Sequence, residues 1–207
     1  MLDLLLDGRE HSLGLLAETA GVVVSTATEH LRQLESGGLV VSRRDGRRRL
    51  VRLAGSEVAE AYEALAMLSS QRPVSSLRAW SRREELRSAR TCYDHLAGRL
   101  GVAIADAALA VGAVEPDLSL GPAAEEWLAR FAVDLAQLPR RPRPLVRACT
   151  DWTEHRDHLA GTLGAAICTA VLSAGWVVRR PSSRALRVTP LGEMRLGELG
   201  CLPAGGM

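Results

Sequence analysis

Two cysteines and three histidines in the second half of the chain could together bind a metal ion. Cys92 and His95 are three residues apart, a spacing that places two side chains on one face of a helix, and His155 and His158 repeat it. Cys149 lies a few residues before the second pair. Thiolate and imidazole groups suit Zn²⁺ or a similar transition-metal ion. We therefore expect a site for metal or thiol sensing here, with Zn²⁺ or another transition metal as the candidate effector.

The same residues have two other interpretations, because they lie in an internal repeat. The run from Asp94 to Gly101 (DHLAGRLG) returns as the run from Asp157 to Gly164 (DHLAGTLG). Duplication would preserve histidines that cap or cross-link the interface between the two copies, which is a purely structural role. They could also line a pocket for an organic ligand, with help from the tryptophans of this half, although these fit a hydrophobic core more simply: Trp80, Trp127, Trp152 and Trp176.

Motifs for catalysis are absent from the sequence. There is no nucleophile elbow, phosphate-binding loop or paired-carboxylate motif, so we expect no enzyme activity. Cys168, in an apolar stretch, is interpreted as a buried core thiol and Cys201 as incidental.

Arginines between residues 43 and 52 form a second candidate binding group, because they concentrate positive charge in a short segment. They surround Asp45-Gly46, which predicts a type I′ turn between strands at Leu39–Val41 and Leu50–Leu53. The net charge of the chain is only +2, so the local clustering is what matters. A solvated charge run is the alternative to a phosphate-binding surface. We expect contacts to double-stranded DNA from Arg43, Arg44, Arg47, Arg48 and Arg49.

Two short helices precede this hairpin and would position it. Ser12 can cap the first helix, and Gly21 supplies the turn to the second, which ends at Gly37-Gly38. A pair of helices meeting at a glycine is the geometry that sets a second helix into the DNA major groove, although a surface helix of an enzyme is the alternative. We expect an inward stripe of Val24, Ala27, Leu31 and Leu34. The outward residues expected to contact DNA are Ser25, Thr26, Thr28, Glu29 and Arg32.

The predicted fold class is mainly α with short β-hairpin wings. Residues 1–72 would form a winged helix-turn-helix domain for DNA binding and dimerisation, and residues 73–207 a sensor, effector or dimer-brace domain. The boundary is placed at Gln71-Arg72-Pro73, and a Pro-Arg run from Pro139 to Pro144 links two winged-helix-like repeats, residues 90–138 and 147–200. Each repeat reads as helix, two short strands and helix. The dimer helix is expected at Ser56–Ser70, with an apolar stripe of Val58, Ala61, Leu65 and Leu68.

The segment from Leu4 to Leu68 resembles the ArsR/SmtB family of winged-helix repressors. The resemblance rests on LLDGREHSLGLLAETAG, STATEHLRQLESGGLV and RRDGRRRLVRL, which occur in that order. It implies a homodimeric repressor that binds DNA through the second helix and the wing. The family's cysteine-pair metal box and its dimer-helix metal box are both missing, which argues against metal sensing by the usual family routes.

These observations together predict a sequence-specific DNA-binding regulator, a homodimeric repressor released by an effector that acts on the C-terminal domain. The alternative is a DNA-binding module tethered to a ligand-binding or enzymatic C-terminal domain. We expect no membrane partner, because no apolar run approaches the length of a membrane span. The scattered cysteines and the absence of a signal peptide predict a cytoplasmic protein.

Overall fold

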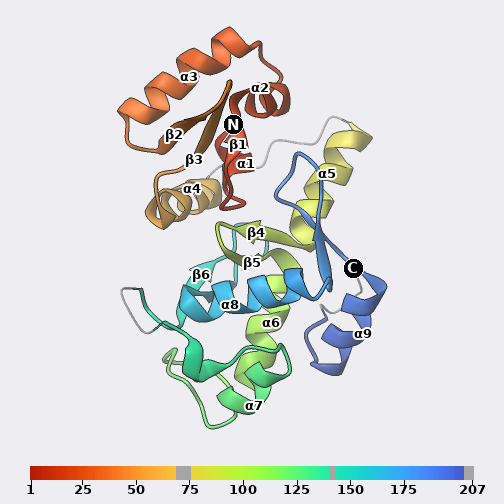
Figure 1. Cartoon of the computed structure of the whole chain (residues 1–207). Coiled ribbons are helices and arrows are strands. Elements are labelled where there is room, and N and C mark those ends of the chain that lie inside the picture. The colour runs from red at the N-terminus through yellow and green to blue at the C-terminus, as the bar shows by residue number, and fades with distance from the viewer. Residues whose placement is uncertain (69–75, 140–142, 203–207) are drawn as a thin grey trace.

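A computed structural model of the chain describes residues 1–68, 76–139 and 143–202, and Figure 1 shows its mixed α/β architecture. Small antiparallel sheets alternate with helices, and an N-terminal part lies above a C-terminal part in that view. The N-terminal elements are α1 (Leu2–Leu5), β1 (His11–Ser12), α2 (Leu13–Ala20), α3 (Val24–Ser36), β2 (Val40–Asp45), β3 (Arg48–Leu53) and α4 (Ser56–Leu68).

Local sequence explains where these elements begin and end. The Ser12 hydroxyl accepts a hydrogen bond from the Leu15 amide and caps α2, as predicted. Gly21 ends α2 with φ 67°, a left-handed conformation that favours glycine, and thereby lets α3 start after Val23. Strand order is β1-β3-β2, so the hairpin is extended by a short strand that precedes α2.

The apolar core of the N-terminal part lies between α1, α2, α3 and the sheet. Leu4, Leu16, Leu31 and Val51 are completely or almost completely buried there. The predicted inward stripe of α3 is correct for Ala27 and Leu31, which are buried, and Leu34 is half-buried. It is wrong for Val24, which is 54% exposed because it stands in the first turn of α3, beyond the edge of the core.

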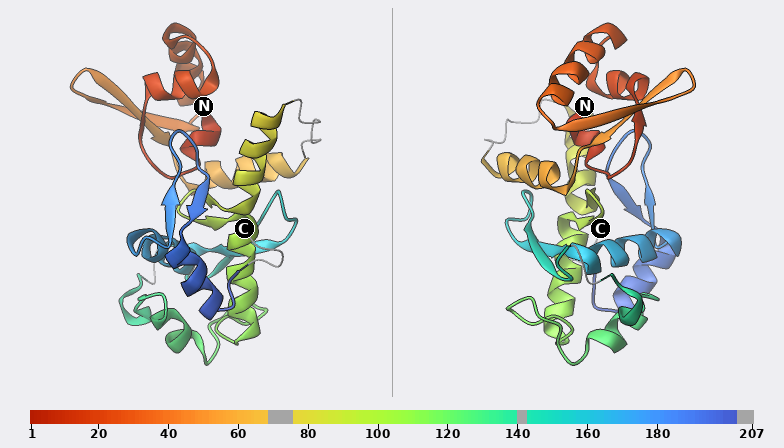
Figure 2. Two further views of the ribbon diagram at one scale, coloured as in Figure 1. Left: turned by 90° about the vertical axis from the view of Figure 1, so that its right-hand side faces the viewer. Right: turned by 60° about the vertical axis from the view of Figure 1, so that its left-hand side comes forward.

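The turn of the hairpin differs from its prediction. Asp45 pairs with Arg48, so the two loop residues are Gly46 and Arg47 rather than Asp45 and Gly46. Gly46 has φ 57°, and Arg47 is not in the left-handed region. A type I′ turn needs positive φ at both loop residues, whereas a positive φ at the first alone is what a type II′ turn requires. Both views of Figure 2 show this hairpin projecting clear of the rest of the molecule.

The C-terminal part contains two units that each begin with a hairpin followed by a long helix. The first unit has a single bridge, Val114 to Leu120, where the second has a further hairpin. The elements are α5 (Leu77–Ser88), β4 (Arg90–Cys92), β5 (His95–Ala97), α6 (Gly98–Ala110), α7 (Ala124–Ala129), η1 (Leu135–Gln137), β6 (Arg147–Thr150), β7 (Asp157–Ala160), α8 (Gly161–Ser173), β8 (Val177–Arg179), β9 (Leu186–Val188) and α9 (Pro190–Glu198).

The two units pack crosswise, with the helix of each against the hairpin of the other. A Cβ atom added to Gly101 of α6 would lie 3.4 Å from the Cβ atom of His158, and one added to Gly164 of α8 would lie 3.3 Å from that of His95. Bare glycine backbone therefore lets each helix approach the opposite hairpin closely. One hydrophobic core spans both units, with Leu100 of α6 and Leu163 of α8 fully buried in it.

The tryptophans divide between core and surface. Trp127 and Trp176 pack on Phe131, with ring centroids 4.8 and 5.7 Å apart, so core filling accounts for these two. Trp152 lies under the Arg90 guanidinium, 5.2 Å from its ring centroid, and Trp80 is 56% exposed. The predicted domain boundary at residues 71–73, the end of the dimer helix at 69–70 and the Pro-Arg linker at 140–142 lie outside the described residues. Among the described helices, none combines the length and hydropathy that crossing a bilayer requires.

Candidate functional site

The outer face of α3 carries the residues that were predicted to contact DNA. The helix begins after Val23, whose apolar side chain is 67% exposed and gives no hydrogen bond to the first turn. The Thr28 hydroxyl donates to the Val24 carbonyl at 2.7 Å, so its proton is already used within the helix. All the predicted α3 contact residues are exposed: Ser25, Thr26, Thr28, Glu29 and Arg32.

Glu29 organises the middle of this face. Its carboxylate accepts hydrogen bonds from Arg32 at 2.7 Å and from Gln33 at 3.1 Å. The Arg32 hydrogen bond, with that of Gln33, lowers the pKa of Glu29 to about 2. Arg32 is thus held beside Glu29 along the helix, which neutralises part of the positive charge predicted for this face.

The arginines of the β2–β3 hairpin fall into two groups. Arg43 is paired with Glu10 at 2.6 Å, and Arg49 with Glu35 of α3 at 2.7 Å. Among the arginines of this hairpin, three are exposed and have neither an ion pair nor a hydrogen bond from their side chains to any residue that the structure describes: Arg44, Arg47 and Arg48. Arg43 and Arg49, which were also predicted to contact DNA, bind carboxylates that sequence reasoning did not connect to them. Their contact with DNA stays a prediction.

Arg49 also fixes the hairpin against α3. Its Nε donates to the Ser42 hydroxyl at 2.9 Å, and that hydroxyl in turn donates to Glu35. Arg44 stands directly opposite Arg49 in the sheet. Like charges opposite each other repel, so Glu35 compensates one arginine and the other has no acidic partner among the described residues.

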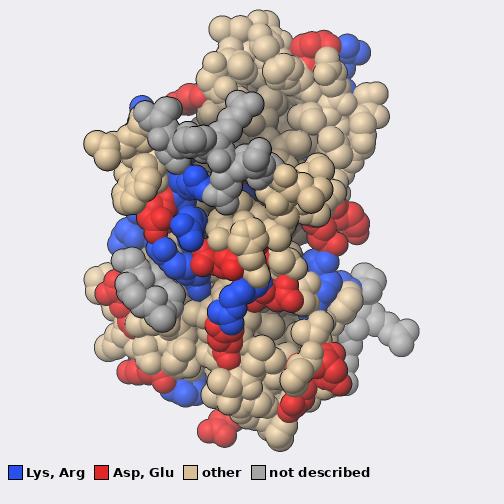
Figure 3. All heavy atoms as spheres, turned by 180° about the vertical axis from the view of Figure 1, so that it is seen from behind, with Lys and Arg blue, Asp and Glu red and all other residues tan. Residues whose placement is uncertain are grey.

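Basic charge is not confined to the hairpin. Figure 3 shows arginines intermixed with acidic side chains across the middle of the face opposite to that of Figure 1. Helix α5 contributes Arg78, Arg82, Arg83 and Arg87 together with Glu84 and Glu85. In α5, Arg87 pairs with Glu154, and Glu84 and Glu85 pair with Arg99 and Arg180. The unpaired arginines of the hairpin differ from the α5 arginines in standing on a projecting ribbon, away from these pairs (Figure 2).

Four of the five predicted metal ligands converge in the C-terminal part. Cys92, His95, Cys149 and His158 each offer one ligand atom, and these atoms all lie within 4.8 Å of one another. We call these four residues the Cys/His cluster. All four side chains are buried, with exposed fractions of 9% or less. The cluster sits where the two crossed hairpins meet.

The secondary structure around the cluster differs from the prediction. Cys92 and His95 do not share a helix face: they face each other across the β4–β5 hairpin, and Cys149 and His158 do so across β6–β7. His155 is exposed in the longer turn of the second hairpin, with φ 53°, and lies outside the cluster. By sequence spacing, Cys92 corresponds to His155, since each stands three residues before the histidine of its repeat. By strand pairing, Cys92 corresponds to Cys149, since each lies opposite that histidine.

A carboxylate contacts the Nδ1 atom of each cluster histidine. His95 Nδ1 lies 3.2 Å from Asp94 and His158 Nδ1 lies 3.3 Å from Asp151. In the described structure, both Nε2 atoms are buried without a hydrogen-bond partner. Burial alone would lower the pKa of each histidine, but the carboxylates raise it. The neighbouring Cys149 thiol and burial raise the pKa of Cys92 to about 12, against the opposing effect of the two histidines.

Asp151 anchors the second histidine from a fully buried position. Its carboxylate accepts from the Gly98 amide at 2.6 Å, from Thr153, and pairs with Arg90 at 3.0 Å. Burial would raise the pKa of Asp151, but His158 and Arg90 outweigh it and hold this pKa well below its usual range. Asp151 was not predicted as a site residue, because its position before the repeated DHLAG box gives no sign of this role.

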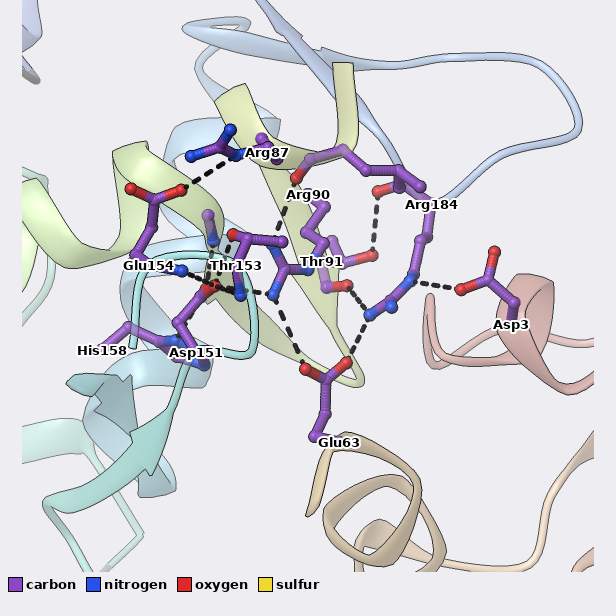
Figure 4. A network of polar contacts seen from close by, with 12 residues as sticks. Asp3, Glu63, Arg87, Arg90, Thr91, Asp151, Thr153, Glu154, His158 and Arg184 are labelled. Carbon is purple, nitrogen blue, oxygen red and sulfur yellow. Dashed lines mark hydrogen bonds and ion pairs between the residues drawn. The ribbon is translucent and has the colours of Figure 1, made fainter. Parts of the chain in front are cut away.

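A buried ion network continues from Asp151 to the N-terminal part (Figure 4). Glu63 of α4 lies between two arginines, 3.6 Å from Arg90 and 2.6 Å from Arg184. Arg184 also binds Asp3 at 3.0 Å. Glu63 and both arginines are almost completely buried, so these charges depend on one another for compensation.

The hairpin that carries Cys92 and His95 also contacts the N-terminal part directly. Its two-residue turn begins with Tyr93, whose amide donates to the Leu6 carbonyl at 2.6 Å. Gly8 packs so closely on Tyr93 that an added Cβ atom would lie 2.6 Å from the Tyr93 carbonyl oxygen. Two of the four cluster residues are therefore separated from the N-terminal core by a single turn.

A known protein resembles this chain over most of its length, and two others resemble about a third of it. The uncharacterized HTH-type transcriptional regulator YdfF of Bacillus subtilis is 36% identical over 193 residues, which cover 92% of this chain and 85% of that protein. The HTH-type transcriptional regulator Rv0324 of Mycobacterium tuberculosis is 37% identical over 71 residues, 34% of this chain and 31% of that protein. No protein-family model matches the chain.

A solved structure gives a shorter match. A possible transcriptional regulatory protein from Mycobacterium bovis, fragment 1–100, is 34% identical and covers 31% of this chain and 72% of its own, with a TM-score of 0.29. The match to YdfF, which spans the N-terminal helices and the C-terminal units alike, carries the assignment. The chain belongs to the family of HTH-type transcriptional regulators.

Proposed function

We propose that this protein is a homodimeric, sequence-specific DNA-binding repressor of the ArsR type, acting in the cytoplasm. In this proposal α2 and α3 form the helix-turn-helix. The β2–β3 hairpin, hereafter the wing, lies along the adjacent phosphate backbone of the DNA. Helix α3 enters the major groove with Ser25 and Thr26 toward base edges. An effector acting on the two C-terminal units, each of which we interpret as winged-helix-like, releases the DNA.

The observation that carries the proposal is the unpaired charge of the wing. Arg44, Arg47 and Arg48 are exposed and without acidic partners in the described structure, whereas Arg43 and Arg49 are paired. Three exposed, uncompensated guanidinium groups on a projecting ribbon suit the oxygens of a phosphate backbone. The Arg49–Glu35 pair supports the same proposal, because it holds the wing at a fixed angle to α3.

Exposed apolar side chains support the dimer. Leu65 and Leu68 of α4 are 66% and 83% exposed, and Leu77 and Trp80 of α5 are 84% and 56% exposed. Large apolar residues exposed in neighbouring elements are typical of an interface between subunits. A two-fold dimer would present two α3 helices to two half-sites, which increases both affinity and specificity.

DNA binding can be tested by removing two wing charges. In Arg47→Ala/Arg48→Ala, affinity for a selected duplex and for a random duplex should fall by similar factors. The slope of log affinity against log salt should flatten by about two units, since each lost phosphate contact is worth about 0.9. Arg187→Ala/Arg195→Ala removes the same charge from exposed positions of β9 and α9 and should leave the slope unchanged. Equal slopes in wild type and wing variant would refute a role of the wing in DNA binding.

The selected duplex comes from a random library enriched on the wild-type protein. Enriched sequences should contain two inverted half-sites about one helical turn apart, as a two-fold dimer requires. A single half-site would contradict the dimer, and no enrichment would contradict sequence-specific binding.

A further inference from the structure

The two histidines of the Cys/His cluster each have a buried nitrogen atom without a partner among the described residues. In the part of the chain that the structure describes, the Nε2 atoms of His95 and His158 are buried and accept or donate no hydrogen bond. They lie in the same cluster as the two buried cysteines, and the four ligand atoms are within 4.8 Å of one another. Buried nitrogen atoms without a hydrogen-bond partner are unfavourable, and a cation bound between the four ligand atoms would give both Nε2 atoms a partner.

We propose that Cys92, His95, Cys149 and His158 bind one Zn²⁺ ion, and that its binding is the signal that the C-terminal units transmit to the N-terminal helices. The chemistry of the ligand set favours zinc: two thiolates and two imidazoles complete a tetrahedral shell without water. Ligand atoms on one zinc ion lie about 3.3–3.8 Å apart, given bonds of about 2.0–2.3 Å. The cluster therefore needs to contract by about 1 Å at its widest.

The surroundings of the histidines fit this assignment. Asp94 and Asp151 contact the Nδ1 atoms and leave Nε2 for the metal, which is the carboxylate–histidine–metal arrangement of zinc proteins. Four protein ligands leave no open coordination position, so the site fits a structural or sensory role rather than catalysis. A pocket of about 380 Å³ between α4 and β6 reaches Cys149 and is lined by Glu60, Glu63 and Arg147.

Contraction of the cluster would act on the N-terminal part through two routes. The turn between Cys92 and His95 holds the Leu6 carbonyl through the Tyr93 amide. His158 contacts Asp151, which pairs with Arg90, and Arg90 meets Glu63 of α4. Metal binding would therefore change how α1 and α4 are both positioned against the C-terminal part. This regulatory part rests on the proposed DNA-binding function, whereas the metal site does not.

The site is tested on the full chain, stripped with a chelator under reducing conditions and titrated with Zn²⁺ or Co²⁺ alone. We expect one ion per chain, and with Co²⁺ the intense visible bands of tetrahedral coordination together with a thiolate-to-cobalt charge-transfer band. Cys92→Ser and His158→Gln should lose binding, while Cys168→Ser, a buried cysteine outside the cluster, should keep it. Circular dichroism identifies any variant that fails to fold.

A measurement on the wild type alone keeps the test decisive if the variants misfold. Cys92 and Cys149 should resist a thiol reagent in the zinc-loaded protein and react after chelation, as peptide mapping can identify. Absence of stoichiometric binding, or Co²⁺ spectra without the thiolate band, would overturn the metal site. A Cys92–Cys149 disulfide in place of metal binding would overturn it in favour of a thiol switch.

The regulatory part is tested by DNA affinity of the full chain with and without Zn²⁺, using the selected duplex. We expect a change of at least about fivefold, the lower range of allosteric coupling, and no change in His158→Gln. Zinc binding with unchanged DNA affinity would refute the signal and leave a structural zinc site. Failure to bind DNA in either state would refute the proposed function, and the metal titration would be unaffected.

Discussion

Replacing Glu63 with glutamine should destabilise the protein more than any surface charge change on the same helix. The carboxylate is 2% exposed, and it lies 2.6 Å from Arg184 and 3.6 Å from Arg90. Glutamine keeps the shape but removes the charge that compensates two buried guanidinium groups. Breaking a buried ion pair by removing one partner typically costs about 3–5 kcal/mol.

The lower end of that range applies here, because each arginine retains a second carboxylate. Arg184 keeps Asp3 and Arg90 keeps Asp151. We therefore expect a loss of about 3 kcal/mol, which lowers the melting temperature by about 6–12 °C for a chain of this size. Differential scanning calorimetry at neutral pH and moderate salt measures it.

Glu60→Gln is the matched control. Glu60 is on the same helix and pairs with Arg147 at 2.7 Å, but both side chains are substantially exposed. An exposed pair contributes at most about 1 kcal/mol, so the melting temperature should fall by no more than about 4 °C. Equal melting temperatures for Glu63→Gln and Glu60→Gln would refute the reasoning that Glu63 is the charge on which the contact between the two parts depends.

Three other substitutions test separate features. Thr26→Ala should narrow the difference in affinity between selected and random DNA, because base contacts specify while phosphate contacts position; a uniform loss in binding titrations would contradict this role. Leu65→Glu, at a position 66% exposed in the single chain, should yield a folded monomer in sedimentation analysis, and a persistent dimer would exclude α4 from the interface. Gly101→Ala should lower the free energy of unfolding in urea by about 1–3 kcal/mol, since its Cβ atom would lie 2.5 Å from the Leu96 carbonyl oxygen. Gly14→Ala is the control: its Cβ atom would have nothing within 4 Å, so the change should be neutral or stabilising.

Local signals explain what could be predicted of the fold. Ser12, Gly21 and Gly46 determine caps and turns within a few residues, so the boundaries of α2, α3 and the wing were close to those observed. The DHLAG boxes were misjudged because a short strand that enters a helix at a glycine has the same apolar content as a helix. Only the positive φ of Gly98 and Gly161, which sequence does not reveal, marks the change from strand to helix.

The candidate metal ligands were found by residue type, but their relation to one another depends on strand pairing. Cys92 and His95 are three residues apart and Cys149 and His158 nine, yet both pairs are direct cross-strand neighbours. The extra residues form the turn that holds His155 away from the cluster. Glu63, Arg90 and Arg184 could not be connected from sequence either, because residues far apart in the chain bring those charges together.

Crosswise packing of the two C-terminal units has a consequence for how they stay together. Each histidine packs on the helix of the other unit: Gly164 of the second lies over His95, and Gly101 of the first lies over His158. A chain with one unit would have to bind a second molecule to bury the surface around its histidine, so its oligomeric state would vary with protein concentration. Joining both units in one polypeptide makes the encounter intramolecular, with an effective concentration on the order of millimolar. The pairing of the hairpins is therefore independent of how many copies of the protein are present.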